Sequence, residues 1–274
     1  GIDELTVEKS SEYIKMVAFG FPAIGIFMAL RYHMQGVGIT SPFAVASVIG
    51  FIANIPLNYI FIFGFGDIPA MGAQGCGIAT AISMWLSALI ITLYVLTKKS
   101  LQQFMPTLRP VAPDPTTIKE ILSIGAPVGA TFFLETAVFA GIALLVSSLG
   151  DVAIGAHQIA FNVWDMFYIP MLAIGSSMAT RMGHALGAQD QQGVFMALKA
   201  GILCSGVISV TTMIILLSFP TAIVGIYSDS QDISLLAVRL LSFAALFVII
   251  DAVQIVGSFS MRAYKKTRFP FIES

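Results

Sequence analysis

Charged side chains are scarce in this sequence. Asp, Glu, Lys and Arg make up only 11% of its 274 residues, less than half of the roughly 25% found in an average soluble domain. Hydrophobic residues make up 57%, and apolar runs long enough to cross a bilayer as helices recur along the chain. An ordinary soluble domain is therefore excluded, and we predict an all-α, multi-pass membrane protein.

Other scarcities exclude further classes of protein. The chain has two cysteines, Cys76 and Cys204, and both lie in apolar segments, where we expect packing roles rather than a disulfide or a metal site. The glycine-rich stretch 71–77 lacks the Lys-Ser/Thr pair that would follow in a phosphate-binding loop. The net charge of −1 gives no reason to expect a nucleic-acid partner. We expect no cofactor.

The apolar runs predict seven membrane spans in two groups. The spans are 13–35, 43–65, 71–98, 118–149, 152–180, 194–226 and 235–264. Four of the twelve prolines lie between the third and fourth spans, in the longest hydrophilic segment, which is typical of an extended linker. We therefore predict a three-helix region at 1–97, a cytoplasmic linker at 98–117 and a four-helix region at 118–274.

The positions of the basic residues predict the orientation. If the spans alternate in direction, loops 31–42, 98–119, 181–199 and 262–268 share one side of the membrane and hold eleven of the fourteen Lys and Arg residues. Because basic residues favour cytoplasmic loops, we expect the N-terminus outside and the C-terminus in the cytoplasm.

The last span carries an acid near its middle. Asp251 begins a polar stripe at helical spacing that continues through Gln254, Ser258 and Arg262. A charged side chain at the bilayer centre costs about 3 kcal/mol, so such residues face the interior of the bundle and mark pathways for ions or substrates. Asp251 is thus the first candidate site residue.

Two further acids lie inside predicted spans. Glu135 and Asp165 are each thirteen or fourteen residues from the outer ends of their helices, about 20 Å along the axis, and we expect them at similar depth. Because no Lys or Arg lies deep in a span, we do not expect a structural salt bridge to hold the acids. We predict that they serve a transported ion.

Amide and hydroxyl side chains form shorter polar stripes on other spans. Gln158 and Asn162 precede Asp165 at helical spacing, and Asn54 pairs with Asn58 in the second span. Such stripes line a hydrated cavity or form hydrogen bonds between helices in a packed bundle, and the sequence leaves both interpretations open.

A faint repeat joins the two helical regions. At a separation of 227 residues, Met34 pairs with Met261 and Thr40 with Thr267, and a Pro-Phe dipeptide follows each stretch. Both stretches lie at the predicted cytoplasmic ends of helices that run in the same direction, as a parallel repeat requires. A repeat of this length holds about six helices.

Short motifs in a consistent order carry a family resemblance. They are Leu57-Asn58-Tyr59, Gly72-Ala73-Gln74-Gly75, Gly125-Ala126-Pro127, Phe133-Leu134-Glu135, Ala156-His157-Gln158-Ile159-Ala160, Arg181-Met182-Gly183, Leu186-Gly187-Ala188, Asp251-Ala252-Val253-Gln254 and Arg262-Ala263-Tyr264-Lys265. Together they resemble the multidrug and toxic compound extrusion (MATE) family, in particular its NorM-like branch. That family folds as twelve helices in two six-helix lobes, and the resemblance assigns this chain to helices four to ten.

The resemblance implies a cation-coupled multidrug efflux antiporter that works by alternating access, with sodium or protons as the coupling ion. It implies organic, often cationic, drugs as substrates, the bacterial inner membrane as location, and a monomer at full length. Glu135 and Asp251 match the cation site of the second lobe. Asn54, Asn58 and Thr80 match a polar network of the first lobe.

Further side chains are candidates for contacts with the cation or the substrate. They are Asp165, Phe247, Gln158, Asn162, Gln254, Phe132 and Phe139. Relatives often have Tyr where this chain has Phe247, which allows a cation–π contact but no coordination by a hydroxyl.

Three other functions fit parts of the pattern. A related flippase of lipids or saccharide-lipids would share the bundle but should have a more cationic cavity. A heptahelical receptor or retinal protein would match seven spans, although the last span lacks a Lys for a Schiff base. An intramembrane carboxylate enzyme would need the acids at close range around a scissile substrate.

Overall fold

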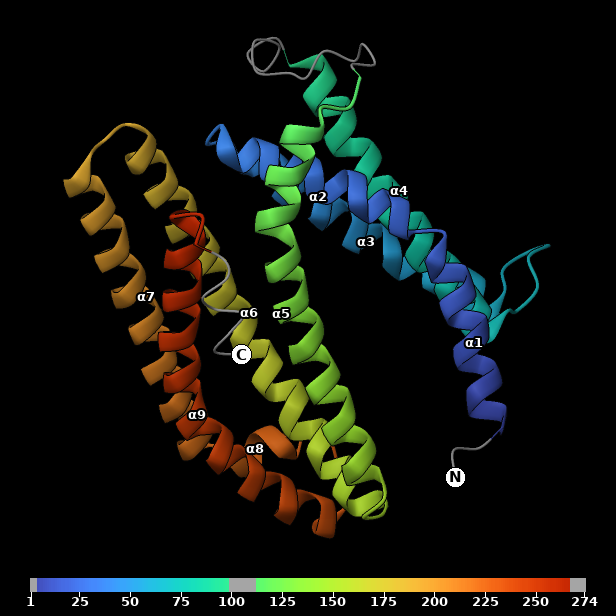
Figure 1. Cartoon of the computed structure of the whole chain (residues 1–274). Coiled ribbons are helices and arrows are strands. Elements are labelled where there is room, and N and C mark those ends of the chain that lie inside the picture. Colours follow the sequence, from blue (N-terminus) through green and yellow to red (C-terminus); the bar gives the residue numbers. More distant parts are fainter. Residues whose placement is uncertain (1–3, 99–111, 267–274) are drawn as a thin grey trace. The chain divides into compact units, whose positions relative to one another are not determined.

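A computed structural model describes residues 4–98 and 112–266, and these residues form helices and no β-strand (Figure 1). Six of the described helices are long and apolar enough to cross a membrane, or up to seven if one bent pair counts as a single span. The prediction of an all-helical, multi-pass membrane protein is therefore confirmed. The chain divides into two compact units, Gly1–Val111 and Ala112–Ser274.

The first unit begins with the bent pair of helices. α1 (Glu4–Ala18) and α2 (Phe21–Gly36) meet at an angle of 49°. Pro22 lies in the first turn of α2. Proline has no backbone N–H, and in the first turn an N–H would have no acceptor within the helix. The pair covers the predicted first span, 13–35, and begins before it, at Glu4.

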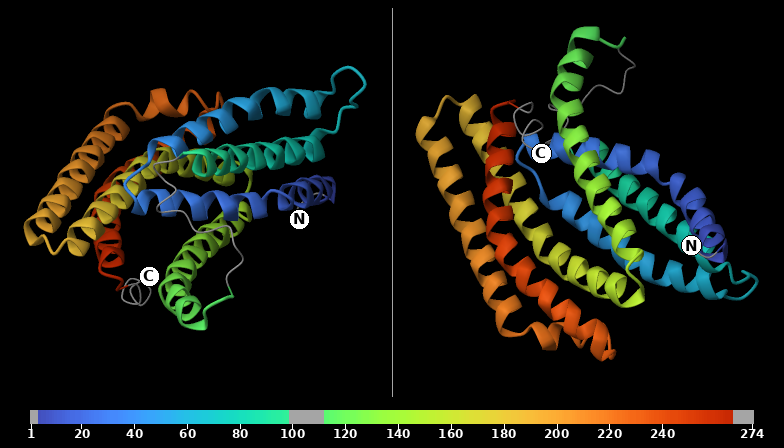
Figure 2. Two further views of the ribbon diagram at one scale, coloured as in Figure 1. Left: turned by 90° about the horizontal axis from the view of Figure 1, so that it is seen from above. Right: turned by 60° about the horizontal axis from the view of Figure 1, so that its bottom comes forward.

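α3 (Ser41–Phe63) and α4 (Gly72–Thr97) form a hairpin, with the connecting loop projecting from one end (Figure 2). Gly75 lies so close to the backbone of Phe61 that a β-carbon there would collide with the Phe61 carbonyl, and a β-carbon on Gly77 would lie 2.7 Å from the Tyr13 carbonyl oxygen. The small residues at the start of α4 thus permit close contact between helices, as small residues commonly do in membrane proteins.

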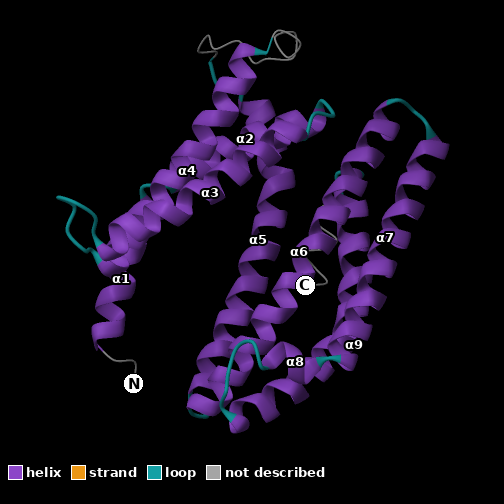
Figure 3. Ribbon diagram, turned by 180° about the vertical axis from the view of Figure 1, so that it is seen from behind, coloured by secondary structure: helices purple, strands orange, loops and turns teal. Residues whose placement is uncertain are grey.

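The second unit contains α5 (Pro115–Ser147), α6 (Asp151–Gly187), α7 (Gln191–Ser218), the short α8 (Pro220–Val224) and α9 (Gln231–Ala263). Figure 3 shows α6, α7 and α9 side by side, and each contacts the other two extensively. Their shared core includes Ala156, Leu216, Leu241 and Val248. α5 packs mainly against α6.

Helix boundaries differ from the predicted spans in three places. α6 continues to Gly187 rather than ending near residue 180 and is about 55 Å long, well beyond the roughly 30 Å of a bilayer core. The predicted span 194–226 is divided, since α7 ends at Ser218 and Pro220 starts α8. α5 begins at Pro115, inside the predicted linker 98–117, whose residues 99–111 lie outside the described residues.

The start of α5 has a side-chain cap. Asp114 Oδ1 accepts a hydrogen bond from the Thr116 amide at 3.1 Å, and Oδ2 accepts from the Thr117 amide at 3.1 Å and from the Thr117 hydroxyl at 2.5 Å. The Thr117 hydroxyl, followed by the two amides, lowers the pKa of Asp114 below its usual value, because these bonds stabilise the ionised carboxylate.

This cap predicts a dependence on pH. Since the pKa of Asp114 is lower in the folded than in the unfolded chain, its stabilisation is complete above the unfolded value of about 3.9 and is lost as the pH falls through the lower folded value. Hydrogen exchange should show protection of the Thr116 and Thr117 amides that is constant from neutral pH to about pH 5 and declines below about pH 4. Asp114→Asn retains an acceptor and should remove this pH dependence; the same decline in that variant would contradict the assignment.

Candidate functional site

Asp251 is held by a tryptophan from another helix. It lies near the middle of α9, half-buried, between the core residues Val248 and Ala252, which pack in the α6–α7–α9 core. The indole Nε1 of Trp164, in α6, donates a hydrogen bond to Asp251 Oδ2 at 2.9 Å. The bond leaves the other carboxylate oxygen, Oδ1, without a hydrogen bond from the described residues. That oxygen is available to a proton or a cation.

α5, α6 and α9 enclose a cavity of about 440 Å³ around this carboxylate. We call it the acid cavity. Its lining residues are Phe132, Leu134, Glu135, Thr136, Val138, Phe139, Phe161, Trp164, Asp165, Tyr168, Asp251 and Gln254. The structure therefore brings all three predicted acids to one cavity, together with Gln254, Phe132 and Phe139.

Aromatic rings form much of the remaining wall. Phe139 of α5 lies 5.3 Å from Phe161 and 5.4 Å from Trp164, measured between ring centroids. Trp164 also stacks on Tyr168, with centroids 4.6 Å apart. Such a wall offers apolar surface and negative ring faces to an organic cation. The carboxylates beside it can neutralise the positive charge of the cation.

Arg262 lies beside a ring that lines the acid cavity. Its guanidinium lies over Phe132, 5.1 Å from the ring centroid, and over Phe259, at 4.6 Å. Its positive charge acts on Glu135. Because α9 continues to Ala263, a residue predicted at the membrane edge reaches back along the bundle, as long basic side chains commonly do. Arg262 thus offsets part of the negative charge of the cavity.

Three candidates lie outside the acid cavity. Gln158 is exposed, and Asn162 Oδ1 accepts a hydrogen bond from the Tyr227 hydroxyl at 3.0 Å. Phe247 is 57% exposed and does not line the cavity. Both polar residues lie on α6 closer to its start than Asp165, and of these three side chains only Asp165 lines the cavity.

Trp164 was not among the site residues predicted from the sequence. The only local signal was its position beside Asp165 in an otherwise apolar span. Its partner Asp251 is 87 residues away, and no spacing rule within one helix connects them.

In the first unit, Asn54 and Asn58 form a small network. Asn54 Nδ2 donates to Ser83 Oγ at 3.1 Å, and Asn58 Nδ2 donates to Asn54 Oδ1 at 2.7 Å. Thr80 donates to the Cys76 carbonyl of its own helix at 2.9 Å. Asn54 and Thr80 line a cavity of about 370 Å³, whose lining within the described residues includes no acid. The network alone therefore lacks a charge to bind a cation.

Fold and cavity together define a class: a multi-pass helical membrane protein with carboxylates facing an internal cavity. The MatE family model matches residues 2–60 and 127–274. The chain belongs to the MatE family, and the predicted family is confirmed.

Named relatives agree with this assignment. The chain is 35% identical over 273 residues to the multidrug resistance protein NorM of Photobacterium profundum, covering 100% of this chain and 60% of the relative. It is 36% identical over 264 residues to the NorM protein of Vibrio cholerae, covering 96% and 58%. The chain thus spans about three fifths of the length of these relatives.

Solved structures share the fold. A MATE crystal structure in complex with MaL6 has a TM-score of 0.86 at 20% identity and covers 99% of this chain and 60% of its own. The eukaryotic MATE transporter AtDTX14 has a TM-score of 0.85 at 20% identity and covers 97% and 59%. At this identity the likeness concerns the fold alone.

Proposed function

We propose that the full-length protein is a cation-coupled antiporter that exports organic, often cationic, compounds from the cell. The observation that carries the proposal is the acid cavity, where Glu135 and Asp251 lie beside Asp165 and a wall of aromatic rings. Relatives named as multidrug resistance proteins support the substrate class.

Competition for the same carboxylates supplies the coupling. A proton, a sodium ion and an organic cation each neutralise the negative charge of Glu135 and Asp251, and burial makes a site with surplus charge of either sign unfavourable. An external cation that enters the cavity therefore displaces the drug. Binding of the drug from inside displaces the cation in turn.

Arg262 reduces the net negative charge of the acid cavity, which the bound ligands must neutralise. The cavity has three acids, and Arg262 acts on one of them, Glu135. The two others, Asp165 and Asp251, have no ion pair among the described residues. This surplus of negative charge favours entry of cations over anions.

Alternating access completes the proposal. The repeat between the two helical regions fits two lobes that rock about the linker 98–117. We propose that the N-terminus of this chain faces outward and the C-terminus the cytoplasm, that the protein lies in the bacterial inner membrane, and that it works as a monomer. No observation on the described residues favours the flippase, receptor or carboxylate-enzyme alternatives.

Ion jumps in vesicles test the coupling. Full-length protein in proteoliposomes loaded with a fluorescent organic cation should release it faster when sodium, or protons, are added outside. A sodium jump at constant pH and a pH jump without sodium identify the ion. Release that responds to neither jump, in vesicles where the protein binds the drug, would refute cation-coupled antiport.

A further inference from the structure

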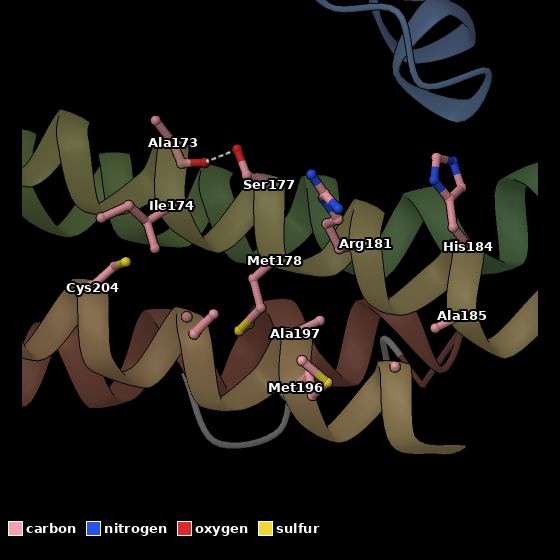
Figure 4. Close-up of a pocket in the computed structure, with 13 residues that line it drawn as sticks. Ala173, Ile174, Ser177, Met178, Arg181, His184, Ala185, Met196, Ala197 and Cys204 are labelled. Carbon is pink, nitrogen blue, oxygen red and sulfur yellow. Dashed lines mark hydrogen bonds between the residues drawn. The ribbon is translucent and has the colours of Figure 1, made fainter. Parts of the chain in front are cut away.

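α6 and α7 line a third hollow, which shares no lining residue with the acid cavity (Figure 4). We call it the α6–α7 groove; its volume is about 860 Å³. Its apolar walls are formed by Ala173, Ile174, Met178, Met196, Ala197, Ala200, Gly201 and Cys204. Met178 occupies the space that a β-carbon on Gly201 would need, so α6 and α7 pack closely at this point of the groove.

One end of the groove is basic. Arg181 and His184 lie one turn apart on α6 and point to the same side of the helix (Figure 4). The Arg181 side chain is exposed and has no hydrogen bond or ion pair within the described part of the chain. Asp190, in the following loop, uses its carboxylate to cap α7, accepting from the Gly193 amide at 2.9 Å. The positive charge of Arg181 therefore has no partner among the described residues.

The dimensions of the groove match one leaflet of a bilayer. From Ala173 to His184 it follows α6 for eleven residues, about 16 Å along the axis, and half of a bilayer core is about 15 Å. α6 is longer than the core, and Arg181 is six residues from its end. α6 is therefore long enough for the basic end to reach the level of the headgroups while the apolar walls extend toward the bilayer centre.

We propose that the α6–α7 groove binds a phospholipid with an anionic headgroup. Arg181 binds the phosphate, and an acyl chain lies along the apolar walls toward Cys204. The match of charge and shape carries the proposal, because basic pockets between membrane helices bind anionic headgroups and the apolar walls match the acyl chains of a lipid. The proposal is independent of drug export and of the coupling ion.

Native mass spectrometry tests the lipid site. Protein of full natural length is exchanged into detergent with equal phosphatidylglycerol and phosphatidylcholine, and retained lipid is counted. We expect preferential retention of phosphatidylglycerol, weakened about fivefold in Arg181→Gln. The matched control is Arg239→Gln, which removes an exposed arginine of α9 outside the groove and should change nothing. Equal retention of both lipids, or unchanged retention in Arg181→Gln, would overturn the proposal.

A second variant tests the apolar walls. Ala200 is an exposed lining residue of α7, and Ala200→Phe should reduce retention of phosphatidylglycerol by narrowing the groove while leaving ion-driven export intact. In full-length protein whose other cysteines, Cys76 included, are replaced by alanine, a bilayer-soluble maleimide should modify Cys204. Added phosphatidylglycerol should slow this reaction. If segments of the full-length protein cover the groove, Cys204 will not react, and the lipid site is refuted.

Discussion

Asp251→Asn should abolish cation-driven drug export by the full-length protein. The substitution keeps the size of the side chain but removes a negative charge of the acid cavity, for which ion and drug compete in the proposed mechanism. Charge-assisted contacts contribute roughly 1.5–3 kcal/mol, about 10-fold to 100-fold in affinity for each cationic ligand. Efflux from proteoliposomes after an ion jump should fall to the leak rate of drug-loaded vesicles that contain no protein.

Two related variants make this result specific. Trp164→Phe removes the donor to Asp251 Oδ2 but keeps an aromatic ring and the carboxylate, and should slow export without abolishing it. Asp232→Asn changes an exposed acid in the first turn of the same helix and should leave export unchanged. Wild-type rates in Asp251→Asn would remove the mechanism.

Glu135→Gln should also abolish coupled export, and it should weaken the binding of cationic drugs more than the binding of neutral drugs. Glu135 faces the acid cavity and interacts with the positive charge of Arg262. Without Glu135, this charge is less compensated and repels an incoming cation. Binding of a cationic drug, measured by fluorescence titration, should weaken roughly 10-fold to 100-fold, whereas a neutral drug of similar size should bind nearly as before.

The double variant Glu135→Gln/Arg262→Gln tests the charge argument directly. It should regain part of the affinity for the cationic drug but none of the ion coupling. Glu120→Gln is the matched control on α5, since Glu120 is exposed and pairs with Lys265 at 2.9 Å, and exposed ion pairs contribute little. Equal loss for both drugs would indicate a structural role for Glu135.

The sequence was sufficient to predict the membrane helices and most of the acid cavity. Long apolar runs predicted α3, α4 and α9, because about 20 mostly apolar residues are needed to cross a bilayer as a helix and a helix satisfies its own backbone hydrogen bonds in lipid. Acids in such runs cannot face lipid without a large cost, which is why Glu135, Asp165 and Asp251 were expected to face inward, and all three line one cavity.

The remainder depended on contacts between distant segments. The extent of α6 was missed because a helix continues past the bilayer without a change of pattern at Arg181. Trp164 was missed because its partner is 87 residues away. Arg262 was placed at the membrane edge, whereas its reach back to Phe132 depends on how α5 lies beside α9. Periodicity indicates on which face of a helix a residue lies, but it does not identify the residue of another helix that the side chain contacts.

The bond between Trp164 and Asp251 has a practical consequence. An indole that donates to a carboxylate senses the charge on that carboxylate, so its emission changes when the acid is neutralised. This chain has only one other tryptophan, Trp85, which donates to the Phe19 carbonyl in the first unit. With Trp85 replaced by phenylalanine, the chain carries a single tryptophan, bonded to Asp251, and neutralisation of that acid becomes readable without a dye.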